Sequence, residues 1–304
     1  MEEYDYIIIG GGPGGYSSAI YAARYNLKTL VIAKERGGLI TTTHLIENWP
    51  GVKSATGLEL MDAVEAHVKH LNVPIVDGIV LSLEKDGDTF IVKTRDDKYK
   101  AKAILLATGT KHRHLTVPGA EEFNGRGISY CATCDGAFFK NKVVAVIGGS
   151  DTSAKEALVL SEIAAKTYII YRREKIRAEP INYDRVMKKV EEGKIEIIYR
   201  TNITEVKGDK MVTGVTLDNE FNGSKELELQ GVFGAIGLIP QTGLAKSIGV
   251  DLDERGEIKI DRDSKTNIPG VYAAGDCTDS GFKQAITAAA EGCTAANSAF
   301  QRIR

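Results

Sequence analysis

The 304-residue chain is long enough for about two domains, and its 43% apolar and 26% charged residues are typical of a globular protein. Its 39 basic and 41 acidic residues give a net charge of −2, so the chain lacks the basic surplus typical of nucleic-acid binding. No apolar run is long enough to cross a membrane, and four cysteines in a chain of this length exclude a secreted disulfide framework. The acidic start, Met1–Asp5, leads directly into a predicted strand, so we expect no signal peptide and a cytoplasmic location.

The first motif is typical of dinucleotide binding. A strand is predicted over Tyr6–Ile9, and a helix rich in small residues over Tyr16–Tyr25. Between them, Gly10, Gly12 and Gly15 match G-x-G-x-x-G. In such a loop one glycine makes the tight turn, the next lets backbone N–H groups approach a pyrophosphate, and the third lets helix and strand pack closely. A glycine-rich structural turn is the alternative.

The next strand and loop offer further candidate contacts. A strand over Thr29–Ile32 ends just before Glu35, which lies where a ribose hydroxyl would need an acceptor. The polar loop that follows contains Gly37 and Gly38 and runs on to Asn48. Its composition fits a loop that lines a ligand, and a purely structural loop is the alternative.

A helix and an antiparallel insertion are predicted next. Apolar residues at helical spacing indicate a helix over Leu58–Leu71. Strands are then predicted over Pro74–Leu83, Thr89–Thr94 and Tyr99–Ala101. We expect these strands to form an insertion that packs on a parallel sheet. A buried strand over Ile104–Leu106 follows and is closed by Ala107, Thr108 and Gly109.

The cysteines of Tyr-Cys-Ala-Thr-Cys-Asp-Gly indicate redox chemistry. Cys131 and Cys134 are close enough in sequence to form a small disulfide ring, and a Cys-x-x-Cys pair that opens a helix has one thiol of lowered pKa. Asp135 follows at once and could donate and accept the protons of thiol–disulfide exchange. Half a zinc site and two ordinary buried thiols are the alternatives. Cys277 and Cys293 lie far away in sequence, so we predict no metal site.

An internal repeat follows the cysteine pair. A strand over Val143–Ile147 runs into a second glycine-containing loop and a helix over Thr152–Ile163, and a strand over Lys166–Ile170 completes a second βαβ unit. The candidate nucleotide contacts in its loop are Gly148, Ser150 and Thr152. The unit closes with a strand and a glycine at Val232–Gly237, as the first one does. Two such modules flanking a redox pair predict two cofactors that exchange electrons.

Charged residues mark the ends of two later strands. Arg172, Arg173 and Arg177 follow the second βαβ strand, where an acid would select NAD, and they suit a 2′-phosphate. A solvated charge run is the alternative. Asp276 follows a strand over Val271–Ala274 and precedes a helix over Phe282–Ile303, a place suited to binding ribityl hydroxyls or phosphate.

Taken together, the motifs resemble those of the low-molecular-weight thioredoxin reductases, class II pyridine nucleotide-disulfide oxidoreductases, over essentially the whole chain. The matching stretches are Gly10–Gly15, Thr41–Gly51, Ala107–Thr110, Gly125–Gly136, Arg172–Arg177, Ala273–Asp276 and Gln284–Thr287. The resemblance implies an α/β fold of two Rossmann-like, three-layer domains, the second inserted in the first. FAD would bind to residues 1–114 and 241–304, and NAD(P)H to residues 115–240, which also hold the cysteine pair.

The resemblance also implies a role for individual residues. The FAD positions are Gly10, Gly12, Gly15, Glu35, Asn48, Asp276, Gln284 and Ala285, to which we add the loop residues Gly37, Gly38, Thr108 and Gly109. The NADPH phosphate positions are Arg172, Arg173 and Arg177. Cys134 would face the flavin, Cys131 would attack the partner's disulfide, and Asp135 would be the acid/base. A homodimer is implied in the same way.

One departure concerns the electron donor. The family's inner loop usually reads Gly-x-Gly-x-x-Ala, whereas this chain has Ser150 at the second glycine and Asp151 after it. Ser150 brings a Cβ atom to the place where backbone approaches the pyrophosphate, and Asp151 adds negative charge beside it. The arginines favour NADPH nevertheless.

We therefore expect a thioredoxin-disulfide reductase that passes electrons from NADPH through FAD and the cysteine pair to a thioredoxin-like or glutaredoxin-like protein. The main alternative is a disulfide reductase of the same fold that uses NADH, ferredoxin or a deazaflavin. Two further alternatives are the flavoprotein subunit of an alkyl hydroperoxide reductase, which carries an extra N-terminal region, and a redox sensor that only retains FAD.

Overall fold

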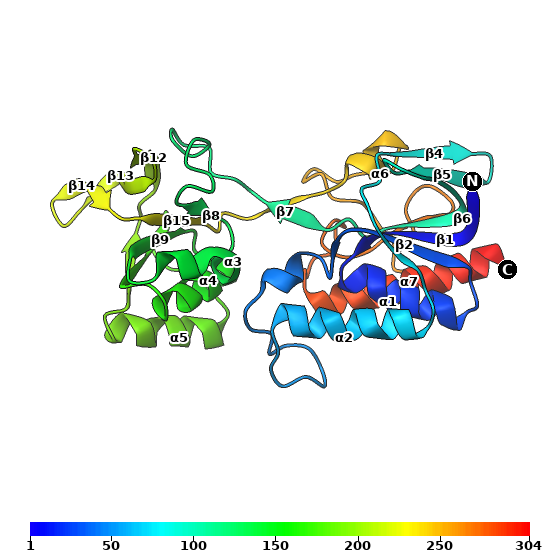
Figure 1. Cartoon of the computed structure of the whole chain (residues 1–304), viewed down its shortest axis with the longest axis horizontal. Coiled ribbons are helices and arrows are strands. Elements are labelled where there is room, and N and C mark those ends of the chain that lie inside the picture. Colours follow the sequence, from blue (N-terminus) through cyan, green and yellow to red (C-terminus); the bar gives the residue numbers. More distant parts are fainter. The chain divides into compact units, whose positions relative to one another are not determined.

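The computed structural model describes all 304 residues, which divide into two compact units (Figure 1). Unit 1 comprises Met1–Lys111 together with Ile239–Arg304, and unit 2 comprises His112–Leu238. The chain passes between them through β7 (Thr110–His112) and β16 (Leu238–Pro240), which pair with each other. Both units have the α/β architecture that the sequence predicts. The assignment of FAD to one and NAD(P)H to the other stays a prediction.

Unit 1 is built on a seven-stranded sheet in the order β3-β2-β1-β6-β5-β4, with β17 also paired to β6. Its strands are β1 (Glu2–Gly11), β2 (Thr29–Arg36), β3 (Ile75–Asp77), β4 (Ser82–Asp86), β5 (Thr89–Lys93), β6 (Lys98–Leu106) and β17 (Val271–Ala273). β1 runs parallel to both β2 and β6 in the middle of the sheet. Its apolar residues Tyr6–Ile9 are buried on both faces, which explains why they read as an unbroken apolar run.

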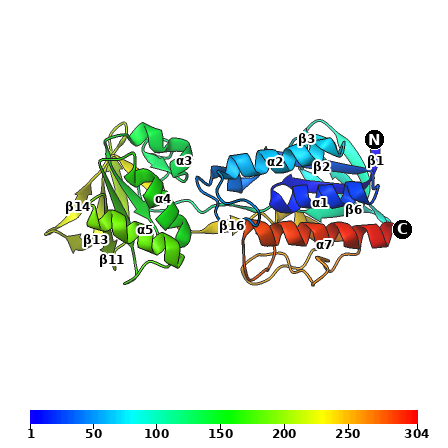
Figure 2. The same ribbon diagram turned by 90° about the horizontal axis from the view of Figure 1, so that it is seen from below.

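Three helices cover one face of this sheet (Figure 2). They are α1 (Pro13–Arg24), α2 (Gly57–His70) and α7 (Ala285–Ile303). The backbones of α1 and α7 approach closely, since a Cβ atom built at Gly292 would lie 2.0 Å from the carbonyl oxygen of Gly14. The short helices of this unit are η1 (Leu39–Thr42) and α6 (Gly243–Ser247).

The predicted antiparallel insertion differs from the observed one in two ways. The strand predicted over Pro74–Leu83 is broken after Asp77, where β3 leaves its parallel pairing with β2 and the chain turns before β4. The strands predicted over Tyr99–Ala101 and Ile104–Leu106 are one strand, β6.

β6 explains how the insertion joins the sheet. One edge of β6 pairs with β1, while the other is divided between β5, at Lys98–Ala101, and β17, at Ile104–Leu106. The β4–β5 hairpin therefore extends the sheet in its own plane. The predicted antiparallel insertion is therefore present, and it joins the parallel sheet by strand pairing with β6.

Unit 2 repeats this arrangement with a five-stranded parallel sheet in the order β11-β10-β9-β15-β8. The strands are β8 (Ile128–Ser129), β9 (Val143–Ile147), β10 (Lys166–Tyr171), β11 (Ile195–Tyr199) and β15 (Gly231–Gly234). A separate antiparallel sheet consists of β12 (Ile203–Gly208), β13 (Val212–Phe221) and β14 (Ser224–Glu228). The helices are α3 (Ala132–Asp135), η2 (Gly136–Phe139), α4 (Asp151–Ser161) and α5 (Pro180–Glu191).

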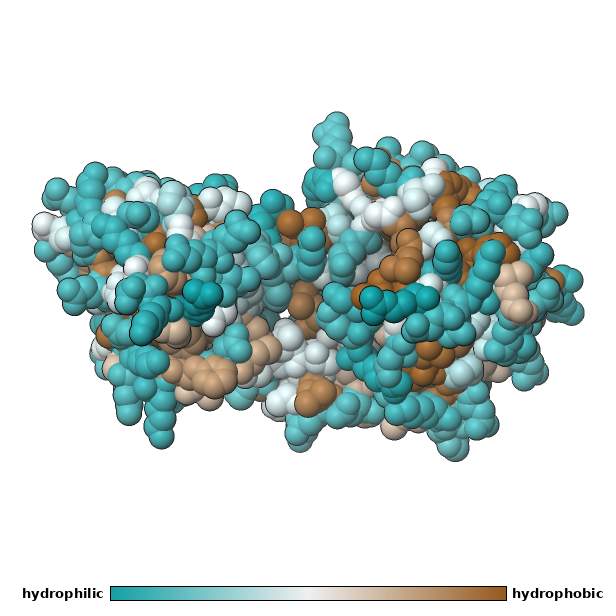
Figure 3. Space-filling view, turned by 45° about the horizontal axis from the view of Figure 1, so that its top comes forward, coloured by the Kyte–Doolittle hydropathy of each residue, from teal (hydrophilic) through white to brown (hydrophobic).

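The surface face shown in Figure 3 is mostly hydrophilic, with apolar side chains scattered over it in small groups. No helix is both long and apolar enough to span a membrane.

Candidate functional site

The glycine loop of unit 1 has one position that the fold leaves open. Gly10 has a φ of +122°, and a Cβ atom there would lie 2.0 Å from the carbonyl oxygen of Ala107. A Cβ atom at Gly15 would lie 1.9 Å from the carbonyl oxygen of Gly10. At Gly12, by contrast, the nearest atom to such a Cβ is the carbonyl oxygen of Gly37, 3.9 Å away. The first and third glycines are thus required by the protein itself, whereas the second borders free space that fits a pyrophosphate.

This loop lies where the strand order reverses. The strand that follows β1 in the chain, β2, lies on one side of it, and β6 lies on the other. In open α/β sheets such a reversal at the carboxyl ends of the strands is the usual place for a nucleotide. Gly38, after β2, approaches the loop so closely that a Cβ atom on it would lie 3.0 Å from the Cα atom of Gly12. Glu35 is exposed at the end of β2 and forms an ion pair with Lys34 at 3.2 Å.

Candidate residues from the two ends of the chain meet in unit 1. The amide nitrogen Nδ2 of Asn48 donates to Oε1 of Gln284 at 3.2 Å. Gln284 directly precedes α7, of which Ala285 is the first residue. The hydroxyl of Thr108 donates to the carbonyl oxygen of Gln241 at 2.6 Å, and the N–H of Gln241 donates to the carbonyl oxygen of Gly109 at 2.9 Å.

Asp276 provides an acceptor that the protein does not use. Its carboxyl group is half-buried and receives no hydrogen bond from the protein, and this burial raises its pKa although Lys283 acts in the opposite direction. Lys283 instead donates to the backbone oxygen of Asp276 at 2.9 Å and to Glu257 at 2.6 Å. The hydroxyl of Thr110 is also buried without a hydrogen-bond partner. Hydroxyl groups of a ribityl chain would satisfy such groups, so the residues present fit FAD.

The redox pair lies in unit 2. Cys131 and Cys134 form a disulfide, with their Cα atoms 5.3 Å apart. The pair opens a helix, as the sequence predicts, because α3 begins directly after Cys131. The N–H of Cys134 donates to Sγ of Cys131 at 3.1 Å, so Cys131 caps this short helix.

Asp135 is linked to the pair through a residue that the sequence analysis missed. The hydroxyl of Ser129 donates to Oδ2 of Asp135 at 2.6 Å and accepts from the N–H of Cys131 at 3.1 Å. Ser129 lies in the two-residue strand β8, which has no recognisable sequence pattern. A second missed residue is Glu156 of α4, whose carboxyl group accepts a hydrogen bond from the N–H of Ala132.

The loop after β9 repeats the first glycine loop, with one change. Gly148 has a φ of +142°, and a Cβ atom there would lie 2.2 Å from the carbonyl oxygen of Ala235, just as Gly10 approaches Ala107. Ser150 occupies the place that corresponds to Gly12 and is the N-cap of α4. Its N–H donates to Oγ of Ser153 at 3.2 Å. Thr152 is exposed in the first turn of α4.

Asp151 differs from our expectation. Its carboxylate accepts from the N–H of Glu179 at 2.9 Å and from Nδ2 of Asn182 at 2.8 Å, and it forms an ion pair with Lys155 at 2.9 Å. Burial alone would raise the pKa of Asp151, but these contacts outweigh it and lower the pKa. The negative charge of Asp151 is therefore compensated by Lys155 and by donors at the start of α5. It would repel a phosphate at this loop much less than the sequence alone indicates.

The arginines lie at the same edge of the sheet as this loop. The N–H of Arg177 donates to the carbonyl oxygen of Gly149 at 2.6 Å, and its Nε donates to the hydroxyl of Tyr171 at 3.1 Å. Arg172 and Arg173 are exposed directly after β10, which runs parallel to β9. Exposed guanidinium groups beside a glycine loop fit a phosphorylated nucleotide.

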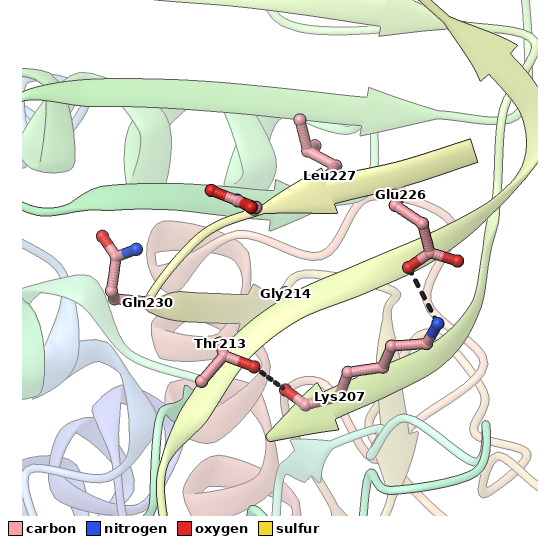
Figure 4. Close-up of a pocket in the computed structure, with 7 residues that line it drawn as sticks. Lys207, Thr213, Gly214, Glu226, Leu227 and Gln230 are labelled. Carbon is pink, nitrogen blue, oxygen red and sulfur yellow. Dashed lines mark hydrogen bonds and ion pairs between the residues drawn. The ribbon is translucent and has the colours of Figure 1, made fainter. Parts of the chain in front are cut away.

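A cavity of about 450 Å³ lies on the antiparallel sheet of unit 2 (Figure 4). Lys207 and Glu226 form an ion pair at 2.8 Å beside it. None of the candidate residues lines this cavity, so we do not assign it to the redox site.

Comparisons with known proteins agree with the motifs. The family model described as pyridine nucleotide-disulphide oxidoreductase matches residues 4–292. A thioredoxin reductase of Coxiella burnetii is 41% identical over 97% of this chain and 95% of its own length. A Pseudomonas fluorescens protein named glucosaminate ammonia-lyase is 42% identical over 95% of this chain and 92% of its own. The crystal structure of Lactococcus lactis thioredoxin reductase matches with a TM-score of 0.94 at 39% identity and covers 99% of both chains.

Proposed function

Because the chain belongs to the pyridine nucleotide-disulphide oxidoreductase family, we propose that it is an FAD-dependent thioredoxin-disulfide reductase. The observation that carries this proposal is the Cys131–Cys134 disulfide at the start of α3, with Asp135 linked to it through Ser129. When bound, FAD supplies a two-electron carrier between a nicotinamide and the disulfide.

Different residues of the chain bind the cofactor, exchange the disulfide and transfer protons. Gly12, Asn48, Asp276 and Gln284 of unit 1 would hold FAD. In the reduced pair, the Cys131 thiolate attacks the partner's disulfide, and one partner sulfur leaves as a thiolate that takes up a proton. Cys134 then attacks Cys131 in the mixed disulfide, which re-forms the Cys131–Cys134 bond and releases the second partner sulfur. Asp135 holds and returns the protons of these steps.

The proposed donor is NADPH. The support is the set of arginines beside the loop at Gly148, together with the compensated charge of Asp151. NADH, ferredoxin and a deazaflavin are the alternative donors. The proposed acceptor is a thioredoxin-like or glutaredoxin-like protein, and we extend the proposal to a homodimer that works in the cytoplasm.

An anaerobic titration of the flavin-loaded protein tests both halves of the proposal. NADPH should bleach the flavin absorbance at lower concentration than NADH, and the reduced protein should reduce a thioredoxin. Cys134→Ser should still retain FAD and still bleach, but it should not reduce thioredoxin, because the mixed disulfide can no longer be resolved. Cys293→Ser, a half-buried thiol on α7, is the matched control and should behave as the wild type.

The outcomes separate donor from acceptor. If neither NADPH nor NADH bleaches the flavin, the proposed donor is refuted. The proposed acceptor is then tested with chemically reduced flavin. A flavin that bleaches in a protein unable to reduce thioredoxin refutes the acceptor.

A further inference from the structure

Glu156 is a half-buried acid whose presence the proposed reaction does not explain. It lies in the middle of α4, on the side that packs against α3. The contact is close, since Ala132 is 1% exposed and packs in one core cluster with Ala157 and Leu160 of α4. A carboxyl group in such surroundings is costly unless it is paired or protonated.

The only hydrogen bond to the Glu156 side chain comes from a residue between the two cysteines of the disulfide. Its Oε2 atom accepts from the N–H of Ala132, the residue that directly follows Cys131. This amide belongs to the first residue of α3, directly between the two cysteines, whereas the N–H of Cys134 donates to Sγ of Cys131. Burial raises the pKa of Glu156 to about 7, although the Ala132 hydrogen bond acts in the opposite direction.

The ion pairs observed on α4 and on the elements packed against it do not include Glu156. Asp135 of α3 is bound to Ser129. Lys166 of β10 pairs with Glu196, and Lys189 of α5 pairs with Glu162 and Glu192. Lys155, next to Glu156 on α4, pairs with Asp151. Each of these lysines is thus paired with another carboxylate, and the one hydrogen-bond donor to Glu156, the N–H of Ala132, lies between Cys131 and Cys134 in the chain.

We propose that Glu156 is a positioning residue that holds the Ala132 amide and takes up one of the protons that accompany reduction of the Cys131–Cys134 disulfide. Reduction adds two electrons, which break the S–S bond. One proton from solvent goes to one sulfur, and a second goes to the Glu156 carboxylate. The product is a thiol, a thiolate and a neutral carboxylic acid. Because the N–H next to Cys131 is hydrogen-bonded to Glu156, repulsion between like charges disfavours the alternative product, a thiolate and a carboxylate on the packed helices α3 and α4.

This inference rests on the proposed redox role of the pair, but its test requires neither a nicotinamide nor a protein partner. The flavin-loaded protein is equilibrated with a small dithiol buffer, and the fraction of reduced Cys131–Cys134 is measured by alkylation and mass spectrometry from about pH 6 to about pH 8.5. Glu156→Gln keeps an oxygen that can accept from Ala132 and removes the charge.

Above about pH 7 we expect the Gln variant to be three- to tenfold more easily reduced than the wild type, a shift of about 15–30 mV in the two-electron potential. Near pH 6, where Glu156 is protonated, the two proteins should agree. Glu162→Gln, which removes an exposed carboxylate near the end of the same helix, should follow the wild type throughout. Superimposable profiles for Glu156→Gln and the wild type overturn the proposal, and so does an equal shift in Glu162→Gln.

A second measurement uses the wild type alone and does not depend on how the variants fold. The reduced-minus-oxidised infrared difference spectrum of protein labelled with ¹³C-glutamate, taken above about pH 7, should show one glutamate carboxylate lost and one carboxylic acid gained. The absence of any glutamate band overturns the proposal.

Discussion

Gly10 and Gly12 lie two residues apart in the same loop, yet replacing each by alanine should have opposite consequences. Gly10→Ala puts a methyl group 2.0 Å from the carbonyl oxygen of Ala107, at a φ of +122°. Overpacking costs about 1–3 kcal/mol and a strained φ about 1–2 kcal/mol, which gives about 2–5 kcal/mol of lost stability. For a unit of this size the midpoint of thermal unfolding should fall by roughly 4–20 °C.

Gly12→Ala should leave the fold intact. Gly12 has a φ of −80° and a ψ of −172°, which alanine adopts without strain, and the nearest atom to the new methyl group is 3.9 Å away. We expect its unfolding free energy to stay within about 1 kcal/mol of the wild type. The methyl group instead fills the space assigned to the pyrophosphate. Loss of a hydrogen bond to a charged group costs about 1.5–3 kcal/mol, so FAD should bind about 10- to 150-fold more weakly.

The assays are thermal unfolding without added FAD and FAD release on dilution, followed by flavin fluorescence. If Gly12→Ala binds FAD as tightly as the wild type, the open side of the loop does not face the cofactor. If both variants unfold at the same temperature, the reasoning from the Cβ positions is wrong.

Three further changes test other parts of the molecule. In steady-state kinetics, Arg172→Ala combined with Arg173→Ala should raise KM for NADPH about 10- to 150-fold per lost phosphate contact and leave KM for NADH nearly unchanged. The control is Arg200→Ala, which removes an exposed partner of Glu174 and should change neither KM. Ser150→Gly should lower KM for NADPH, because it removes the Cβ atom from the loop after β9 at the place that corresponds to Gly12 in unit 1. It should cost only a few tenths of a kcal/mol of stability in denaturant unfolding. An unchanged or higher KM would contradict this reading. Glu65→Gln should flatten the loss of stability between pH 4.5 and about 2. Burial alone would raise the pKa of Glu65, but hydrogen bonds from Lys69, Tyr16 and Arg36 lower it to about 2, so the ionised group stabilises the fold fully above pH 4.5 and loses this effect as the pH falls. A variant whose stability depends on pH as the wild type's does would refute this.

The sequence predicts best where local chemistry determines the structure. The glycine loops at Gly10 and Gly148 follow apolar strands and precede helices, so their position in a βαβ unit could be inferred from the order of the residues. The same is true of the start of α3 at Cys131. In each case neighbouring residues supply the turn, the cap or the buried strand.

Prediction fails where distant segments decide. The two halves of β6 look like separate strands, because the neighbours that distinguish them, β5 and β17, come from different parts of the chain. The antiparallel strands of Ile203–Glu228 were missed because their charged, exposed faces carry a weak pattern. The partial burial of Glu156 could not be recognised, since it depends on the packing of α4 against α3 and other segments of unit 2. The only sequence signal for the burial of Glu156 is its position as a charged residue among the small residues of a helix.

The divided edge of β6 has a consequence for the order in which the chain can fold during synthesis. Unit 2 is a continuous segment, so its sheet can be complete as soon as residue 238 is available. Unit 1 cannot complete its fold so early. The edge of β6 at Ile104–Leu106 has no pairing strand until β17 is made, and the α1 surface at Gly14 has no packing partner until α7 is made. Through the synthesis of more than half of the protein, the N-terminal segment therefore carries an unpaired strand edge beside an uncovered apolar surface, which is where a chaperone would be needed and where aggregation would begin.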